Sequence, residues 1–490
     1  MTHAIPNSLA ELEARLADDL LWLNRPIKDW VRPLESEGRP VLDVAVVGAG
    51  LSGLIAMAAL KQHGIYRVRA FDRAPEGREG PWISYARMET LRTPKALPGL
   101  ALGLPALSFR AWYEAQFGRA AFEAMSLIPT AQWMDYLVWY RRVLDLDIVN
   151  EAAVTEVAHG ADGVFTLSFA TPEGGRIEQA RRVVIATGLD GLGEPFLPPV
   201  AQRVPARFCA HGADPIDMQR LKGRRVAVVG SGSSAMDNAA AALEAGARRV
   251  DIFVRRDTLA KIDKLAGISG FGTRLGYFDL PDADKWEIMQ VASQSTTPPP
   301  RHSVLRVSSW TNAHFHLSSP VLDLVDIGDG VEVVTPKGRY SVDFVIFATG
   351  FGIAFDKRPE FSAITQRALL WHEAYTPPPA LADARLGQSP YLGPAFEFLP
   401  RPGRPEDGWL SRVHCFSFPS LVSHGKINSG IPSINEGATT LANGIARSLF
   451  VEDRAALLEQ FHDYAQTEFT GDEWVDADAA LPDQFLRRRS

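Results

Sequence analysis

The chain has 490 residues, 46% of them hydrophobic and 22% charged, and its formal net charge is -7. That length predicts two or three domains, and the mild acidity argues against nucleic acid as a partner. The two cysteines, Cys209 and Cys415, allow no disulfide framework and no cysteine-rich metal site, so we expect no metal and a reducing, cytoplasmic setting.

Residues 1–40 are predicted to form an N-terminal helical extension. Leucines recur at helical spacing, at positions 9, 12, 16, 20 and 23, which predicts a surface helix packed on the body. The start of the chain has neither the basic nor the apolar region of a signal peptide. The sequence has no uninterrupted apolar run of about 18 residues, so we expect no membrane span.

Residues 41–73 predict a βαβ unit. The apolar run at 41–47 predicts a buried strand, residues 51–63 a helix, and residues 67–73 a second strand. A G-x-G-x-x-G fingerprint joins the first strand to the helix, and it consists of Gly48, Ala49, Gly50, Leu51, Ser52 and Gly53.

This first fingerprint predicts a dinucleotide site. Its glycines permit a tight turn and let a pyrophosphate approach free N–H groups at the start of a helix. Asp72 and Arg73 end the following strand, and a carboxylate there accepts hydrogen bonds from a ribose 2′-hydroxyl but repels a 2′-phosphate. The pattern favours FAD or NAD over NADP. A glycine-rich turn without a ligand is the alternative.

A second βαβ unit begins at Arg225. Its strand is followed by a G-x-G-x-x-A fingerprint, made of Gly230, Ser231, Gly232, Ser233, Ser234 and Ala235. The next strand, 249–254, ends in Arg255 and Arg256 instead of an acidic residue. Because guanidinium groups bind phosphate, this site is predicted to select NADPH. The alternative is that the two arginines are a solvated strand end.

Two similar strands each follow one of the βαβ units. Residues 183–188 read VVIATG and residues 345–350 read VIFATG. Each could close its unit's sheet, and the small residues at the end of each strand let the chain pass close to a bound cofactor. We therefore predict that Thr187 and Gly188 contact the first cofactor, and Thr349 and Gly350 the second.

The fold class predicted from this recurrence is α/β, with two Rossmann-type dinucleotide-binding domains. The expected arrangement is an FAD domain into which an NADPH domain is inserted. The FAD domain would comprise residues 41–203 and, with the C-terminal helices, 351–490, and the NADPH domain residues 204–350.

The two fingerprints in this order, together with the two ATG turns, resemble the class B flavoprotein monooxygenases, over roughly residues 41–450. That group holds flavin-containing, Baeyer–Villiger and N-hydroxylating monooxygenases. His211 matches the histidine of the family's F-x-G-x-x-x-H stretch, although Pro205 and Arg207 stand where the family has Phe and Gly. Trp82 ends a stretch that is similar to the family's G-G-x-W turn over the flavin. The resemblance places His211 and Trp82 at the cofactors.

The resemblance also suggests catalytic residues. Leu91 to Lys95 resembles an x-N-x-P-K stretch whose Asn lies beside the flavin, and here Arg92 takes the place of that Asn. Arg92 could stabilise a peroxyflavin anion, bind a substrate carboxylate, or form a structural ion pair with Glu89 or Asp72. Lys95 of the same stretch, and Asn428 of an irregular segment expected to return to the flavin, are the other catalytic candidates.

The resemblance implies an FAD-dependent, NADPH-using monooxygenase. Such an enzyme forms a C4a-(hydro)peroxyflavin with O2 and transfers one oxygen atom to a small-molecule substrate, here expected to be at nitrogen. Baeyer–Villiger or sulfur oxygenation, a quinone or ferredoxin reductase, and a flavin redox sensor without turnover remain alternatives. A homodimer is also considered. Two isolated cysteines argue against a disulfide reductase.

Overall fold

The computed structural model describes residues 6–427 and 430–477. The chain divides into two compact units, residues 1–447 and residues 448–490. Each unit is described by itself. Within the described residues, no helix is both long and apolar enough to cross a membrane.

The first fingerprint follows the last residue of strand β2, which belongs to a mostly parallel sheet. Its strands follow the order β4-β3-β2-β7-β6-β5, with β1 beside β2 and β18 beside β7. The central strand β2 is buried on both faces, which suits its run of valines. The bounds are β1 Leu34–Ser36, β2 Arg39–Val47, β3 Val68–Phe71, β4 Ile148–Val149, β5 Ala153–His159, β6 Phe165–Thr171, β7 Gly174–Ile185 and β18 Val413–Cys415.

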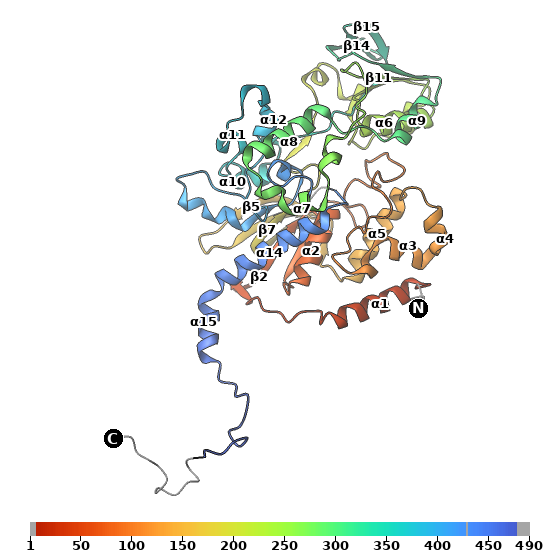
Figure 1. Ribbon diagram of the computed structural model, residues 1–490. Helices are drawn as coiled ribbons and strands as arrows, with labels where there is room; N and C mark the ends of the chain where they lie inside the picture. Colours follow the sequence, from red (N-terminus) through yellow and green to blue (C-terminus); the bar gives the residue numbers. More distant parts are fainter. Residues whose placement is uncertain (1–5, 428–429, 478–490) are drawn as a thin grey trace, which may run out of the picture. The chain divides into compact units, whose positions relative to one another are not determined.

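The second fingerprint lies on a separate parallel sheet with the order β12-β11-β10-β16-β9. A three-stranded antiparallel sheet, β13-β14-β15, accompanies it, and Figure 1 shows α6 and α9 beside the parallel strands. The bounds are β9 Cys209–His211, β10 Arg225–Val229, β11 Arg249–Phe253, β12 Ala313–His316, β13 Asp323–Asp326, β14 Val331–Thr335, β15 Gly338–Val342 and β16 Phe344–Phe347.

Both predicted ATG strands close the sheet of their own βαβ unit. The first is the end of β7, which pairs in parallel with β2, and the second is β16, which pairs in parallel with β10. Each sheet has its own apolar core, one around Val183 and Phe165 and the other around Val228 and Ile252. The predicted α/β fold with two Rossmann-type sheets is confirmed. The strands of the second sheet lie within the predicted insert, 204–350.

Helices surround these sheets in the first unit. The N-terminal helix begins after the cap Ser8 and buries Leu12 and Leu16, as the leucine spacing predicts. The α-helices up to residue 308 are α1 Leu9–Trp22, α2 Leu51–Gln62, α3 Phe109–Phe117, α4 Arg119–Ala124, α5 Thr130–Val143, α6 Ser233–Glu244, α7 Phe271–Gly276, α8 Asp282–Ser295 and α9 Arg301–Ser308.

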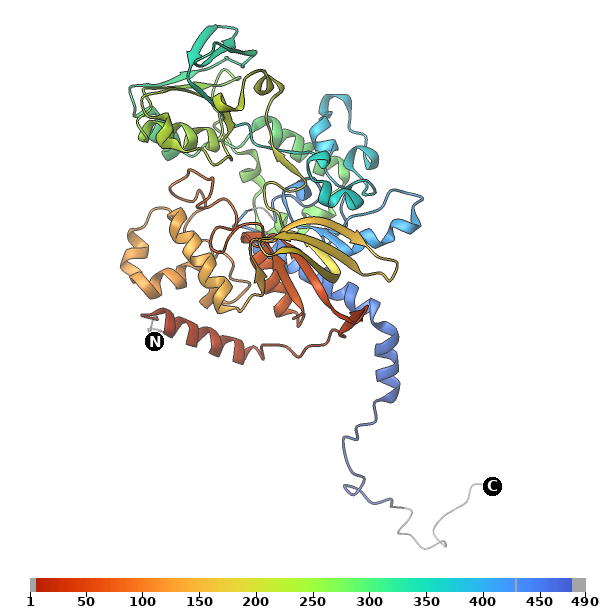
Figure 2. The same cartoon turned by 180° about the vertical axis from the view of Figure 1, so that it is seen from behind.

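The remaining elements are mostly short. A 3-10 helix spans Pro405–Arg412, where the proline suits the first turn. Figure 2 shows the first unit from behind, with β5, β6 and β7 in orange-yellow. The other bounds are β8 Gly193–Pro195, β17 Phe351–Ile353, α10 Ser362–Thr365, α11 Trp371–Ala374, α12 Ala384–Gly387, α13 Leu421–His424 and α14 Ile434–Glu452. In the second unit, α15 spans Arg454–Asp463.

Candidate active site

The first glycine-rich turn is packed too tightly for side chains at two of its glycines. Gly48 has φ +101°, and a Cβ there would lie 2.6 Å from the Ala186 carbonyl oxygen. A Cβ on Gly53 would lie 2.0 Å from the Gly48 carbonyl oxygen. A Cβ on Gly50, in contrast, would make only an ordinary contact with the Gly80 backbone at 3.7 Å, and Gly50 caps the start of α2. The turn is therefore shaped for a diphosphate at a helix N-terminus.

A cavity of about 490 Å³ opens beside this turn. Its wall includes the turn itself, the end of β3, the start of β5 and the end of the first ATG strand. Gly48, Gly50, Leu51, Ser52, Asp72, Arg73, Trp82, Thr187 and Gly188 all line it. Apart from Ala49 and Gly53, which do not line it, the predicted residues of the first site therefore converge on one cavity, whose volume is in the range typical of ligand sites.

Asp72 connects the turn to the strand that follows α2. One carboxylate oxygen accepts from the Ala49 N–H at 2.7 Å and the other from the Ala74 N–H at 2.8 Å. Each oxygen keeps a second lone pair, so the carboxylate can still accept from a ribose hydroxyl. Arg73 is mostly exposed and forms an ion pair with Asp190 at 2.5 Å.

Several other residues of this cavity lie outside the fingerprints and were not predicted from the sequence. Arg78 lines it and has no ion pair among the described residues, so its guanidinium is available to a diphosphate. Arg358 also lines the cavity, bonded to Glu360 at 2.6 Å and to the Gly191 carbonyl oxygen at 2.8 Å. Trp82 has a buried indole N–H that meets no acceptor in the described part of the chain. These donors, with the glycine turn, fit FAD.

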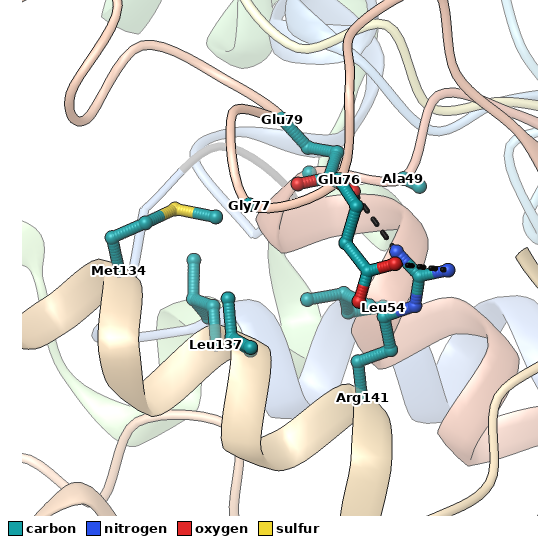
Figure 3. A pocket seen from close by; sticks show the side chains of 10 residues that line it. Ala49, Leu54, Glu76, Gly77, Glu79, Met134, Leu137 and Arg141 are labelled. Carbon is teal, nitrogen blue, oxygen red and sulfur yellow. Dashed lines mark hydrogen bonds and ion pairs between the residues drawn. The ribbon is translucent and has the colours of Figure 1, made fainter. Parts of the chain in front are cut away.

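A buried ion pair fixes the loop that carries Trp82. Glu79 is 5% exposed and accepts from Arg141 Nη1 at 3.1 Å and from Asn150 Nδ2 at 2.6 Å. Figure 3 shows Arg141, on α5, with its guanidinium between the carboxylates of Glu79 and Glu76. The Glu76 contact is longer, at 3.9 Å, and more exposed. Glu79 stands where the family's turn has a glycine, so this anchor is a departure from the family pattern.

We expect Glu79→Gln to weaken FAD binding, because it leaves the buried Arg141 without its carboxylate and loosens the turn before Trp82. Breaking a buried pair costs about 3–5 kcal/mol of stability, and part of that cost falls on the loop. The measurement is the FAD dissociation constant, with thermal unfolding of the apoprotein. Glu76→Gln is the matched control. A comparable loss of FAD affinity in both variants would contradict the role of Glu79.

The second glycine-rich turn repeats the geometry of the first. Gly230 has φ +143°, and a Cβ there would lie 2.5 Å from the Ala348 carbonyl oxygen, in the second ATG strand. Helix α6 begins at Ser233, directly after Gly232. Ala235 is fully buried and ends the fingerprint. The chain therefore has two equivalent glycine-rich turns, and each is packed against the end of its own ATG strand.

The two arginines after β11 differ in their surroundings. Arg256 donates to the carbonyl oxygens of Gln294 and Ser295 and to Thr296 Oγ1, and so caps the end of α8. Arg255 is exposed, and no hydrogen bond or ion pair holds its guanidinium within the described residues. Of the two arginines, Arg255 is therefore the one whose guanidinium is available to a ligand, as far as the described residues show. Arg256 has a structural role.

His211 lies at the end of β9, paired in register with Phe347. Its Nδ1 accepts from the Ala213 N–H at 3.0 Å, which leaves a proton on Nε2 in the neutral ring. That nitrogen is buried and meets no partner in the described ranges. Burial lowers the pKa of His211. Nearby, Thr349 donates to the Phe196 carbonyl oxygen.

The predicted catalytic residues Arg92 and Lys95 make contacts that differ from those expected. Arg92 pairs with neither Glu89 nor Asp72; its Nη2 donates to Asp237 Oδ2, on α6, at 2.7 Å. This ion pair joins the loop after the first fingerprint to the helix of the second. Lys95 donates to three carbonyl oxygens, of Phe122, Glu123 and Met125, at 2.7, 2.9 and 2.6 Å.

Lys95 thus uses all three N–H groups at the end of α4, and this geometry favours a structural role. Asn428 lies outside the described residues. Asn435, on α14, accepts from the Leu102 N–H at 2.8 Å and donates to the Gly99 carbonyl oxygen at 2.7 Å. Cys209 and Cys415 are unpaired. The described residues contain no His, Cys, Asp and Glu grouping that could hold a metal.

Comparison with known proteins decides the family. The family of L-lysine 6-monooxygenase and L-ornithine 5-monooxygenase matches residues 116–269. The FAD-dependent urate hydroxylase of Xanthomonas campestris pv. campestris is 38% identical over 467 residues, which cover 95% of this chain and 98% of that protein. The chain belongs to the class B flavoprotein monooxygenases. The predicted FAD- and NADPH-dependent monooxygenase is thereby confirmed.

Solved structures resemble this monooxygenase in fold. The ornithine N-hydroxylase of Kutzneria sp. 744 is 18% identical with a TM-score of 0.63, and the ornithine hydroxylase of Pseudomonas aeruginosa is 14% identical with a TM-score of 0.62. Both comparisons cover 84% of this chain and 100% of the other. The L-lysine 6-monooxygenase of Pseudomonas syringae is 17% identical with a TM-score of 0.59, covering 83% and 99%. These likenesses support the fold.

Proposed function

We propose that this monooxygenase hydroxylates an oxidised purine, with urate as the first candidate. The observation that carries the proposal is the full-length likeness, at 38% identity, to a urate hydroxylase. The amine hydroxylases of similar fold share only 14–18% identity. Urate has a carbon–carbon double bond flanked by ring nitrogens, and that electron-rich carbon accepts the same electrophilic oxygen as an amine does.

A second candidate is N-hydroxylation of a small amine. It is supported by the match of residues 116–269 to the lysine and ornithine monooxygenase family. That match includes the second fingerprint and Arg255, which serve the nicotinamide cofactor and not the substrate. The match therefore supports the use of the nicotinamide cofactor more than it supports a particular substrate. For this reason we favour purine hydroxylation over N-hydroxylation.

The residues of this chain have defined tasks in the proposed reaction. Bound FAD and NADPH supply the redox chemistry and the activation of dioxygen. The turn at Gly48 to Gly53 and Arg78 hold the FAD diphosphate, and Asp72 accepts from its ribose. Arg255 holds the NADPH phosphate. The Arg92–Asp237 ion pair keeps the FAD loop against the NADPH helix, which orients the two cofactors toward each other.

Substrate-dependent turnover tests the proposal. NADPH oxidation, dioxygen uptake and substrate loss are measured in parallel with urate, xanthine, ornithine and lysine. Urate should give one equivalent of NADPH and of dioxygen consumed per urate lost, whereas the amines give only slow, uncoupled oxidation. Coupled turnover with ornithine or lysine and none with urate would overturn the purine assignment and support the second candidate.

We further propose dioxygen as the co-substrate, a cytoplasmic location and a homodimer. In the second unit, α15 exposes Leu458 and Phe461, at 58% and 74%. An isolated helix of this length is marginally stable in water, which favours an apolar partner such as a second copy. Sedimentation of the full chain, compared with Phe461→Ser, tests the dimer. A monomeric wild-type chain would contradict it.

A further inference from the structure

A row of aromatic side chains runs from the FAD cavity into α5. Trp82 lines the cavity, and its ring centroid lies 6.0 Å from that of Trp133. Trp133 lies 5.1 Å from Tyr136, and Tyr136 is stacked on Trp139 at 5.9 Å. Trp133 and Tyr136 are fully buried, and Trp139 is nearly so. We call these four residues the aromatic row.

The hydrogen-bond partners change along the aromatic row. The buried indole N–H groups of Trp82 and Trp133 meet no acceptor within the described residues. The Tyr136 hydroxyl donates to the Leu107 carbonyl oxygen at 2.7 Å. At the far end, Trp139 Nε1 donates to a carboxylate, Glu13 Oε1 on α1, at 3.0 Å. The base that contacts the aromatic row, the Glu13 carboxylate, therefore lies at the end away from the cavity.

This order matters if an indole loses an electron. An oxidised indole is a strong acid at its N–H, so a base beside it traps the charge as a neutral radical. Within the described residues, no base accepts from the indole N–H groups of Trp82 and Trp133. The positive charge left by the lost electron can therefore move on to the next ring. The carbonyl at Tyr136 does not accept its proton, so Tyr136 bridges its neighbours without trapping the charge. At Trp139 the Glu13 carboxylate takes the proton, and the charge is trapped there.

Simple packing does not explain the row. Each buried N–H without a partner costs about 1–3 kcal/mol, and phenylalanine fills similar space without that cost. The Glu13 carboxylate is held ionised by Arg142, whose hydrogen bond lowers the pKa of Glu13. Its side chain is 28% exposed, so solutes reach this end of the row.

We propose that the aromatic row carries oxidising equivalents out of the FAD cavity to Trp139. The oxidant is an oxygen-centred radical, such as hydroperoxyl, released when oxygen activation is not followed by oxygen transfer. Trp82 gives the radical one electron, and with a solvent proton it becomes hydrogen peroxide. Electrons then move from Trp133 and Trp139 toward Trp82. Trp139 loses its N–H proton to Glu13, and a solvent thiol or ascorbate returns one electron and one proton.

Two readouts test this role without using product formation. Laser excitation of the oxidised flavin in the holoenzyme should produce a neutral indolyl radical absorbance in the wild type. Trp139→Phe and Trp133→Phe should lose it. Glu13→Gln keeps every ring but removes the base, so it should leave a radical cation in place of the neutral radical. Trp310→Phe, an exposed indole outside the row, is the matched control.

Peptide mapping after NADPH oxidation without substrate gives the second readout. Oxidised tryptophan should accumulate at Trp139 in the wild type and shift to Trp82 in Trp139→Phe. Glu13→Gln changes a partly exposed side chain on α1, and Trp139→Phe keeps an aromatic ring at its position on α5, so a folding failure of Trp133→Phe leaves the test intact. The proposal is overturned if no indolyl radical forms in the wild type, or if these variants behave like Trp310→Phe.

Discussion

Replacing Gly53 by alanine should weaken the binding of FAD to the enzyme. The added Cβ would lie 2.0 Å from the Gly48 carbonyl oxygen, so the backbone of the turn must move. Overpacking of this kind costs about 1–3 kcal/mol, which corresponds to roughly 5- to 150-fold weaker FAD binding if the cost falls on the bound turn. The measurement is the FAD dissociation constant from quenching of flavin fluorescence.

The control for this variant is Gly175→Ala. Gly175 is exposed in β7, and a Cβ there meets no atom within 4 Å. FAD binding should be unchanged in Gly175→Ala, and thermal unfolding of both apoproteins separates a local effect from a global one. If Gly53→Ala keeps full FAD affinity, the glycine turn is not the FAD cradle.

Replacing Arg255 by alanine should raise the KM for NADPH roughly 10- to 100-fold, because a hydrogen-bonded charge contributes about 1.5–3 kcal/mol. The KM for NADH should barely change, since NADH has no 2′-phosphate. Folding stability should also be retained, because Arg255 is exposed and makes no ion pair with the described residues.

Arg256→Ala is the matched control, since it removes an identical side chain one residue away. It should lower the thermal unfolding temperature, because the last carbonyl groups of α8 lose their cap, and it should affect NADPH and NADH alike. An equal loss of NADPH and NADH affinity in Arg255→Ala would refute phosphate recognition by this residue.

Local sequence signals predicted the two strand–turn–helix units well. Each glycine fingerprint is a contiguous pattern whose strand, turn and helix depend on neighbouring residues, so β2 with α2 and β10 with α6 were both predictable. The ATG strands were predictable for the same reason. Each ATG strand could be assigned to its sheet because the sequence shows an apolar run, typical of a buried strand, that ends in small residues.

Long-range partners were not predictable. Arg256 looked like a second phosphate ligand, but Ser295, which it caps, stands 39 positions further along. Arg92 meets Asp237 across 145 positions. Glu79 lies outside both fingerprints, and only the register of α5 shows that Arg141 faces it. In each case the partner depends on packing between segments that lie far apart in the sequence, which a local sequence pattern does not show.

We infer that this chain transfers one atom of dioxygen to an organic substrate with electrons from NADPH. Turnover with isotopically labelled dioxygen tests it most directly, with urate as substrate and mass spectrometry of the product. We predict one labelled oxygen atom in each product molecule and one NADPH oxidised per product. Unlabelled product, or NADPH oxidation that ends entirely in hydrogen peroxide with every candidate substrate, would contradict the account.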